Sequence, residues 1–335
     1  MRVQQINELF DSFNTKKILI IGDVMIDSYV WGKVNRISPE APVPILNSQK
    51  KENRLGGAAN VALNIKALGA EPILASVIGN DNKGDIFLKL LKQENLSTLG
   101  IISANERVTT TKTRIISGNQ QLIRLDREID TPLDAEMEDA LIQLIIELVE
   151  RQKIDAIIFE DYDKGTITEK VIDKTVKYAN NKKIPTLVDP KKRNFLNYKG
   201  VTFFKPNFKE LKEGTKLDIK KSDFDAIFMA SKQLQQHLDA HYIVTTLSDL
   251  GVFVFDGNGY EVIPAEIRQI ADVSGAGDTV ISVSALCLSS GVDIANVARI
   301  ANLAGGLVCE KVGVVPIDKA QLLDEAIDFF SKAGF

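Results

Sequence analysis

Short apolar segments alternate with helix-like segments along most of this 335-residue chain, and this alternation constrains the possible folds strongly. Each apolar run is long enough for one buried strand, and the runs fall at residues 18–21, 72–78, 156–159, 185–188, 201–204 and 241–245. Helices are expected at about 57–68, 132–152, 167–180, 224–238 and 295–312. Buried strands that alternate with helices form a mainly parallel sheet covered on both faces. The sequence therefore predicts an α/β protein with three layers, αβα.

Two segments depart from this alternation. Residues 29–48 are rich in proline and β-forming residues, and residues 107–126 hold two strand-like arms around Gly118-Asn119, a dipeptide typical of a tight hairpin turn. We assign both to a small β lid over the sheet, within a single domain that spans residues 1–335. The unpaired edges of such a lid tend to find a partner, so a homodimer through the lid is expected.

Composition excludes several classes of partner. With 44% hydrophobic and 26% charged residues the chain is typical of a globular protein, and its net charge of −4 gives no electrostatic reason to expect nucleic acid or an anionic membrane. The apolar run at residues 18–21 is too short for an export signal or a membrane span, so a cytoplasmic location is predicted. Cys287 and Cys309 lie in apolar segments without metal-ligand spacing and are expected to be reduced core residues.

The segment Asp272 to Asp278 reads Asp-Val-Ser-Gly-Ala-Gly-Asp and is followed at once by an apolar stretch that predicts a buried helix. Because the first amides and the dipole of a helix favour an anion, the backbone of Gly275, Ala276 and Gly277 could form a socket for a phosphate. Asp278, in the first turn, could take a proton from a hydroxyl that attacks phosphorus. The alternative is a glycine-rich turn whose aspartate only complements the helix dipole.

Two other phosphate loops can be compared with this one. A P-loop needs a lysine after its second glycine, but the segment from Gly79 to Gly84 is followed by Asp85. A dinucleotide fingerprint needs a third glycine where Val280 stands, and it usually lies in the first βα unit of a chain. The first comparison excludes a P-loop, and the second makes hydride transfer to NAD a poor alternative.

A second glycine pair, Gly56-Gly57, precedes the first predicted helix, and Asn60 falls in that helix's first turn. Paired glycines allow a ligand to approach the backbone closely, and Asn60 could bond a hydroxyl; the alternative is a packing turn. Asp23 and Asp27 follow the first strand, where carboxylates could accept hydrogen bonds from sugar hydroxyls or simply be solvated.

Three segments together resemble the signatures of the ribokinase-like (PfkB) carbohydrate kinases, in the same order and spacing over nearly the whole chain: residues 56–60, 207–210 and 272–278. The resemblance implies a ribokinase-like fold and a sugar kinase that uses ATP and Mg²⁺, and it leaves open a monovalent cation such as K⁺. It implies that Asp278 is the catalytic base and that the amides of Gly275, Ala276 and Gly277 form the anion hole.

The resemblance also implies where the nucleotide binds. It assigns cofactor binding to Asn207, Phe208, Lys209, Glu210, Thr246 and Gly251. Within this set, Asn207 and Glu210 would order Mg²⁺ and the ATP phosphates, partly through water. Adenine is expected beside the loop from Thr246 to Gly251, with residues 301–306 as the other wall.

Four further segments, at residues 22–27, 36–44, 119–126 and 161–165, are similar to those of the D-glycero-β-D-manno-heptose-7-phosphate kinases. This similarity implies phosphoryl transfer to the C1 hydroxyl, giving the 1,7-bisphosphate for the ADP-heptose pathway of lipopolysaccharide cores. A separate phosphatase and a separate nucleotidyltransferase would then act in that pathway, because the chain stops at Phe335. The substrate contacts are expected to be Asp23, Asp27, Gly56, Gly57, Asn60, Arg124 and Lys164.

The distal phosphate of the sugar needs cations, and the candidates are Arg36, Arg114, Arg124 and Lys164. Arg124 and Lys164 are favoured, although each could be a solvated surface charge. Because an anomeric hydroxyl is more acidic than an ordinary alcohol, a carboxylate of ordinary basicity is expected to suffice as the base. Lys205 and Gly118 depart from the family pattern, which puts contacts of the lid in doubt.

Two alternatives stay open. One is a kinase for another phosphosugar, such as a fructose or tagatose phosphate. The other is a non-catalytic sensor of sugar phosphates, against which the joint presence of Asp278, Asn207 and Glu210 argues.

Overall fold

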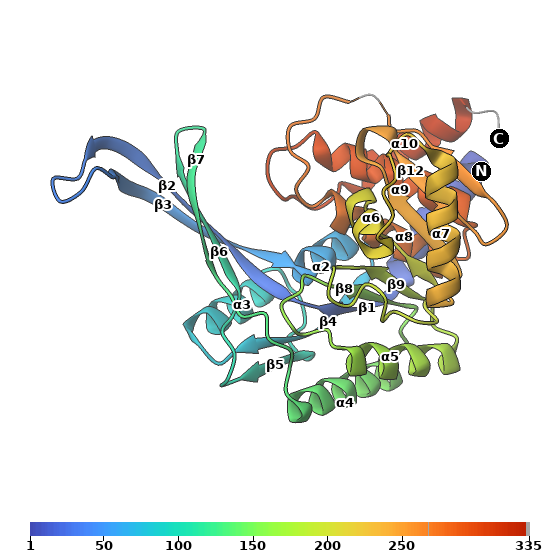
Figure 1. Cartoon of the computed structure of the whole chain (residues 1–335), viewed down its shortest axis with the longest axis horizontal. Helices are drawn as coiled ribbons and strands as arrows, with labels where there is room; N and C mark the ends of the chain where they lie inside the picture. The colour runs from blue at the N-terminus through green and yellow to red at the C-terminus, as the bar shows by residue number, and fades with distance from the viewer. Residues whose placement is uncertain (267, 333–335) are drawn as a thin grey trace.

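The computed structural model describes residues 1–266 and 268–332, and it contains a larger and a smaller sheet (Figure 1). The strands of the larger sheet are β1 (Lys17–Gly22), β4 (Glu71–Gly79), β5 (Ile101–Ala104), β8 (Ala156–Glu160), β9 (Thr186–Asp189), β10 (Phe203–Phe204), β11 (Tyr242–Thr246), β12 (Val252–Phe255) and β13 (Tyr260–Ile263). Their order is β13-β12-β11-β10-β9-β8-β1-β4-β5. All neighbouring pairs are parallel except β11–β12 and β12–β13. The predicted mainly parallel sheet is confirmed.

Helices cover both faces of this sheet. They are α1 (Val3–Ser12), α2 (Ala58–Ala67), α3 (Asn82–Gln93), α4 (Ala135–Arg151), α5 (Glu169–Lys182), α6 (Phe208–Thr215), α7 (Phe224–Leu238), α8 (Ala276–Ser289), α9 (Ile294–Cys309) and α10 (Lys319–Lys332). Side chains of β1 alternate between two cores, because Ile18 and Ile20 pack with α1, α2, α8 and α9 while Leu19 and Ile21 pack with α4, α5 and α7. The predicted three layers are therefore confirmed.

Several elements were not predicted from the sequence pattern, including α1, α3, α6 and α10. Helices α1, α3 and α10 each bury only three residues among those described, so their apolar stripes are narrow. Among the helices of the described ranges, none combines the length and the apolar character that crossing a bilayer requires. Cys287 and Cys309 are free and buried, as predicted.

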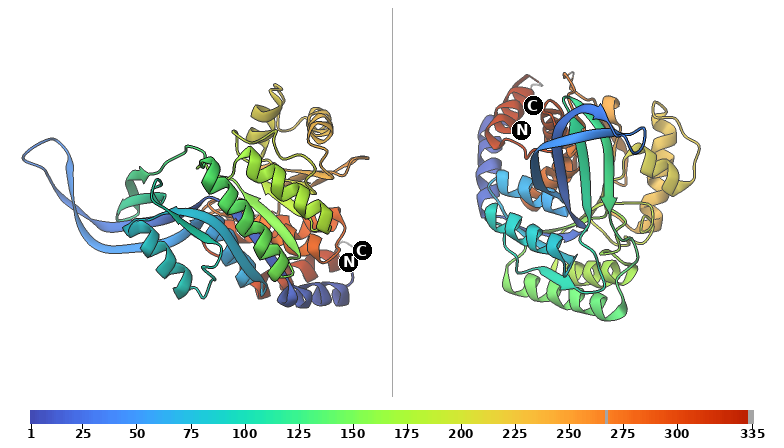
Figure 2. Two further views of the ribbon diagram at one scale, coloured as in Figure 1. Left: turned by 90° about the horizontal axis from the view of Figure 1, so that it is seen from below. Right: turned by 90° about the vertical axis from the view of Figure 1, so that its left-hand side faces the viewer.

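The smaller sheet consists of β2 (Val24–Ile37), β3 (Pro44–Gly57), β6 (Thr111–Ser117) and β7 (Gln120–Arg127), in the order β3-β2-β6-β7. The predicted segments 29–48 and 107–126 fall mostly in these strands, but β3 runs on to Gly57. The Gly56-Gly57 pair therefore ends a strand instead of lying in a turn. The β2–β3 hairpin projects away from the rest of the molecule, as Figures 1 and 2 show.

Candidate active site

Charged side chains gather at the carboxyl ends of β1, β8 and β9 and just after β10, where helix α8 begins. Because these strands are parallel and adjacent, Gly22, Glu160 and Asp189 follow one another across the same edge of the sheet. Lys205 follows β10 at this edge, and α8 packs against β8 and β9. Ligands of open α/β sheets bind at such an edge.

Asp278 lies in the first turn of α8 and is only 7% exposed. Its Oδ2 accepts a hydrogen bond from Asn60 Nδ2 at 2.6 Å, and its Oδ1 accepts one from the Tyr162 hydroxyl at 3.0 Å. Burial raises the pKa of Asp278 to about 6, the two hydrogen bonds and Lys205 oppose the rise, and the Asp189 carboxylate adds to it. This carboxylate is therefore more basic than a solvated one, and so exceeds the ordinary basicity that was expected to suffice for the base.

The backbone at the N-terminus of α8 has the predicted form of a turn into a helix. Gly275 is the N-cap residue with a left-handed φ of 83°, and Ala276 and Gly277 open the helix. The Ala276 amide donates to the Val273 carbonyl at 3.3 Å, so it would have to leave this long bond to join an anion hole. Gly277 lies close to Asp189, since a Cβ added to it would be 3.4 Å from Asp189 Oδ2.

Beside Asp278 is a buried cluster of charged groups. Carboxylate oxygens of Glu160, Asp189 and Asp278 lie within 4.8 Å of one another. Lys205, 3% exposed, contacts Asp189 Oδ2 at 2.7 Å, and Lys191 lies 3.8 Å from Asp189 Oδ1. Although burial opposes it, the two ammonium groups hold the pKa of Asp189 below its usual range. Three carboxylates could hold a divalent cation, but the ammonium of Lys205 already neutralises Asp189 here.

Within the described ranges, no cation forms an ion pair with Glu160, the third carboxylate of this cluster. Burial, then the charges of Asp189 and Asp278, raise its pKa well above the usual range, which favours the neutral form of Glu160. Among the described residues, its buried Oε2 has no hydrogen-bond partner. Sequence reasoning missed Glu160 because the strand that ends there was interpreted only as an apolar run.

Asn207 and Glu210 form a capping box at the start of α6. The Asn207 side chain accepts a hydrogen bond from the Glu210 amide at 2.9 Å, and Glu210 Oε2 accepts one from the Asn207 amide at 2.8 Å. Glu210 Oε1 also contacts Lys191 at 2.8 Å. These oxygens suit Mg²⁺ chemically, but each already has a protein partner, which fits binding through water better than direct coordination.

The other predicted nucleotide residues divide into two groups. Thr246, at the end of β11, forms a bridge with Asn207, and the Gly251 carbonyl accepts a hydrogen bond from the Leu247 amide at 2.7 Å. Phe208 packs against the core beneath α6, whereas the Lys209 side chain is 82% exposed and 3.7 Å from Glu213. Thr246 therefore lies beside Asn207, and Gly251 lies in the loop that follows Thr246. The Phe208 side chain faces the core and the Lys209 side chain faces solvent.

One wall of the predicted adenine site is partly covered. The Arg268 side chain lies over Gly306, where an added Cβ would be 2.8 Å from Arg268 Nε. Arg268 is held there by Glu310 at 3.1 Å and Glu325 at 2.6 Å. The Arg268 side chain thus occupies the Gly306 end of the wall predicted at residues 301–306.

Asp23, one of the predicted sugar contacts, is bonded to the backbone of a neighbouring loop. It is 1% exposed, and its carboxylate accepts hydrogen bonds from the backbone amides of Tyr162, Lys164 and Thr166, each at 3.0 Å. Because three amides donate to its oxygens, Asp23 orders the 162–166 loop, and its contact with a sugar hydroxyl stays a prediction. This loop delivers Tyr162 to Asp278, so Asp23 acts on the site indirectly.

Asp27, four residues further on, lies on the face of β2. It is 6% exposed, and its Oδ1 contacts Arg114 Nη1 on β6 at 2.5 Å. A Cβ at Gly56 would be 2.3 Å from Asp27 Oδ2, so only glycine fits opposite this carboxylate. Gly57 has a φ of 60°, in the left-handed region that favours glycine. The pair thus clears space beside Asp27 and leads into the helix that carries Asn60.

The predicted phosphate-binding cations are spread over the smaller sheet and the 162–166 loop. Arg124 Nε contacts Asp126 at 2.9 Å, and Lys164 Nζ contacts Glu128 at 2.9 Å. Arg36 lies opposite Ile45 in the projecting hairpin, beyond the part of β2 that pairs with β6. Arg36 therefore lies apart from the residues around Asp278 in this chain, and its contact with a phosphate stays a prediction.

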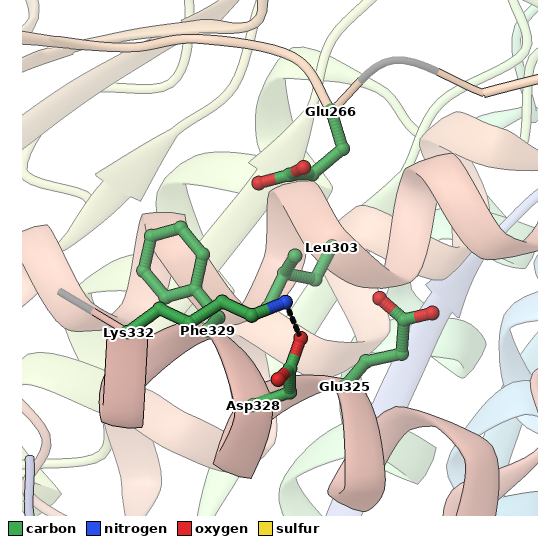
Figure 3. Close-up of a pocket in the computed structure, with 6 residues that line it drawn as sticks. All are labelled: Glu266, Leu303, Glu325, Asp328, Phe329 and Lys332. Atoms are coloured by element: carbon green, nitrogen blue, oxygen red, sulfur yellow. Dashed lines mark hydrogen bonds and ion pairs between the residues drawn. The ribbon is translucent and has the colours of Figure 1, made fainter.

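Two cavities differ in their relation to this edge. A cavity of about 530 Å³ includes Asp27, Tyr29, Arg54 and Asn60 in its walls, and so reaches the residue that bonds Asp278. A second, of about 310 Å³, is drawn in Figure 3 and is lined by Glu266, Leu303, Glu325, Asp328, Phe329 and Lys332. Its three other charged residues are carboxylates and its lysine is paired with Asp328, so it would repel a phosphate.

The molecule has a mainly parallel αβα sandwich, a smaller sheet, and an aspartate at the N-terminus of a helix. These are the features expected of a sugar kinase. The chain matches the family model of the pfkB family carbohydrate kinases over residues 15–320. The chain belongs to that family.

Known proteins extend the comparison. The bifunctional protein HldE of Magnetococcus marinus is 38% identical over 313 residues, which cover 93% of this chain and 64% of that protein. The bifunctional protein HldE of Trichlorobacter lovleyi is 37% identical over 321 residues, 96% of this chain and 65% of that protein. The chain thus spans less than two thirds of the length of these curated relatives. In fold it is similar to phosphofructokinase-2 from Escherichia coli in complex with potassium, with a TM-score of 0.75, 17% identity, and coverage of 94% of this chain and 99% of that one.

Proposed function

We propose that this sugar kinase transfers the γ-phosphoryl group of ATP to the C1 hydroxyl of D-glycero-β-D-manno-heptose 7-phosphate. The observation that carries the proposal is the position of Asp278, a buried carboxylate of raised pKa held by Asn60 and Tyr162 at the first turn of α8. The four motif segments and the similarity to bifunctional HldE proteins support a heptose phosphate as the acceptor.

The proposed reaction needs a base and an anion site at one place. Asp278 accepts the proton of the C1 hydroxyl as that oxygen attacks the γ-phosphorus, and the bond from the γ-phosphorus to the bridging oxygen breaks to release ADP. Donors at the start of α8, the amides of Gly275 to Gly277, stabilise charge on the transferring group. Since Asp278 is mostly ionised only above about pH 6, it can act as the base near neutral pH.

Nucleotide binding is proposed at the Asn207–Glu210 segment and at Thr246 and Gly251. Mg²⁺ held near Asn207 and Glu210 through water would neutralise charge on the phosphate oxygens when bound. Lys191, which links Glu210 to Asp189, is placed to contact a phosphate from the same side. A requirement for K⁺ stays open.

The sugar is proposed to lie between Asp27, the Gly56-Gly57 pair and Asn60, under the smaller sheet acting as a lid. The product would enter the ADP-heptose pathway of lipopolysaccharide cores, in which a phosphatase and a nucleotidyltransferase follow. A homodimer through the smaller sheet is proposed as well, because Leu122, Ile123 and Leu125 on the edge strand β7 are exposed. Sedimentation of the purified chain would test this last point.

The function is tested by incubating the purified chain with MgATP and one acceptor at a time. The acceptors are heptose 7-phosphate, fructose 6-phosphate and tagatose 6-phosphate, and phosphorus NMR of the product identifies the hydroxyl that gains phosphate. We expect the highest kcat/KM with heptose 7-phosphate and an anomeric phosphate in its product. A higher kcat/KM for either other sugar would refute the heptose assignment, and binding without turnover would indicate a sensor.

A further inference from the structure

Tyr162 reaches the proposed base from a loop that two buried carboxylates hold in place. Its hydroxyl donates to Asp278 Oδ1 at 3.0 Å. Asp23 accepts hydrogen bonds from three amides of this loop, including that of Tyr162. Asp161, 1% exposed, accepts one from the Tyr198 hydroxyl at 2.8 Å. The fold therefore fixes the position of the Tyr162 side chain before any substrate binds.

The Tyr162 ring has charged neighbours of both signs. Lys112 Nζ on β6 lies 5.9 Å from the centre of the ring, and Lys191 Nζ lies 5.7 Å from it. Burial raises the pKa of the phenol well above its usual range, so the hydroxyl keeps its proton near neutral pH. The same pKa is raised further by the charges of Asp278, Glu160 and Asp189. Phenylalanine at this position would keep the ring beside the two ammonium groups and remove only the hydroxyl.

The two hydrogen-bond partners of Asp278 differ in what they can do once this carboxylate takes up a proton. Asn60 Nδ2 contacts Oδ2 at 2.6 Å and can only donate, so it stabilises the ionised form. A tyrosine hydroxyl rotates and can donate or accept. The Tyr162 hydroxyl can therefore donate to Oδ1 while Asp278 is ionised, and it can turn and accept from Oδ1 when that oxygen is protonated. Because Tyr162 is partly exposed, the turned hydroxyl can donate to water.

We propose that Tyr162 is a positioning residue that directs the proton of the acceptor hydroxyl onto Oδ1 of Asp278 and then accepts a hydrogen bond from that atom. The proposal rests on the proposed function, since it requires a base that takes a proton from a hydroxyl. The O–H bond of the acceptor breaks, an O–H bond to Oδ1 forms, and the Tyr162 hydroxyl keeps its own proton. A partner of the protonated base stabilises the transition state, whereas a partner of the carboxylate alone stabilises the ground state.

The test compares Tyr162→Phe with Asn60→Ala, which removes the partner that can only donate. For Tyr162→Phe we expect kcat to fall about 10-fold and to stay low at alkaline pH, the size of one lost hydrogen bond. Its acid limb should move upward less than that of Asn60→Ala, because the Asn60 bond lowers the pKa of Asp278 more than the Tyr162 bond does. Lys205 also lowers this pKa, and burial and Asp189 raise it, in both variants alike. The KM values of Tyr162→Phe for MgATP and for the acceptor should stay within about twofold of wild type, because the ring remains.

Tyr198→Phe is the matched control, because it also removes a hydroxyl that donates to a buried carboxylate. The carboxylate in this case is Asp161, which keeps hydrogen bonds from Asn194 Nδ2 at 3.1 Å and from the Asp163 amide at 2.8 Å. We expect a lower urea midpoint for this variant, but a kcat within about twofold of wild type and an unchanged acid limb. A loss of kcat as large as that of Tyr162→Phe would mean that order in the loop is what matters, and not the bond to Asp278.

Urea unfolding of the same variants needs no substrate. Tyr162→Phe should lower the urea midpoint nearly equally at about pH 5 and about pH 8, because the hydroxyl bonds both forms of Asp278. Asn60→Ala should lower it more at about pH 8, because its loss raises the folded pKa of Asp278 further above the unfolded value. Stability is then lost as the pH rises through about 6, where Asp278 ionises.

Either of two further results would overturn the proposal: full recovery of kcat by Tyr162→Phe at alkaline pH, or a loss of its stability that depends on pH as strongly as that of Asn60→Ala. If the wild type does not phosphorylate heptose 7-phosphate, the proposed function fails by itself. The unfolding experiment still decides whether Tyr162 bonds both forms of Asp278, so the two failures can be distinguished.

Discussion

The carboxyl ends of the larger sheet hold Asp278, Asp189 and Lys205 in buried contacts, whereas the smaller sheet, apart from its buried Asp27, holds its charges nearer to solvent. At the strand ends, Asp278, Asp189 and Lys205 are each at most 7% exposed, and all three are bonded to side chains. On the smaller sheet, the side chains of Arg124 and Asp126 are 50% and 24% exposed. One cavity nevertheless reaches both regions, because its walls include Asp27 of the smaller sheet and Asn60, which bonds Asp278.

This difference fits two tasks. Charges that stabilise a reacting group act best when they are buried and already oriented, because no reorganisation is needed during the reaction. Charges that capture and release a substrate can exchange carboxylate partners for phosphate oxygens near solvent at a small energetic cost. Substitutions should therefore affect turnover and folding at the strand ends, and acceptor affinity on the smaller sheet.

The largest expected effect is that of Asp278→Asn. Without a base for the acceptor hydroxyl, kcat should fall by about 10²- to 10⁴-fold. The dissociation constant for MgATP, measured by calorimetry, should stay close to that of the wild type because the amide keeps the size of the side chain. Wild-type turnover by this variant would remove Asp278 from the role of base.

The same variant should be more stable than the wild type at alkaline pH. The pKa of Asp278 is raised to about 6 in the folded protein, so the folded state binds this proton more tightly than the unfolded chain does. Stability from this group is therefore lost as the pH rises from about 4 to about 6, by no more than about 3 kcal/mol in total. Urea unfolding should show a larger advantage of Asp278→Asn at about pH 8 than at about pH 5, and an equal advantage would contradict the linkage.

The next largest effect is expected on stability, where breaking a buried ion pair should cost more than breaking an exposed one. Lys205→Met leaves the Asp189 carboxylate buried without its 2.7 Å partner, and we expect the free energy of unfolding to fall by about 3 to 5 kcal/mol. Arg124→Gln removes a half-exposed pair and should cost less than about 1 kcal/mol. Similar losses in urea unfolding would mean that the two regions do not differ as described.

A smaller effect is expected from Asn60→Ala, which removes the 2.6 Å hydrogen bond to Asp278. This bond lowers the pKa of Asp278, so its loss should move the acid limb of kcat from about pH 6 upward by about one unit. Activity near neutral pH then falls, and it recovers as the pH is raised. A loss of the same factor at every pH would instead indicate displacement of the base.

The parts of the site that are formed by residues at the start of a single helix could be predicted from the sequence. The turn from Gly275 to Asp278 is read directly from small residues before an apolar helix, and Asn207 and Glu210 have the spacing of a capping box. Six strands of the larger sheet, β1, β4, β8, β9, β10 and β11, could be predicted for a similar reason, because each one is a short apolar run. Strands β5, β12 and β13 were not predicted, since β5 and β13 are only partly buried and β12 follows β11 without an α-helix between them. Local patterns determine such elements.

Contacts between distant segments could not be predicted in the same way. Asn60 and Asp278 are 218 positions apart, and only the packing of α2 on α8 brings them together. Asp23 and Asp27 looked equivalent in the sequence. Asp23, however, falls in the connection before β2, facing the amides of residues 162–166, while Asp27 lies on the strand facing Arg114. A carboxylate's role depends on which donors the topology places beside it.

The smallest expected effect is that of Glu160→Gln, although Glu160 lies within the same carboxylate cluster as Asp278. Burial and the neighbouring carboxylates raise the pKa of Glu160 well above its usual range, which favours the neutral carboxyl, and glutamine would replace that form with a neutral group of the same shape. We expect kcat and the acid limb of its pH profile to stay within about twofold and a few tenths of a unit of wild type. If Glu160 were ionised, its replacement would remove a negative charge next to Asp278 and move that limb to lower pH. The direction of the shift therefore tells whether the cluster at the strand ends carries two negative charges or three.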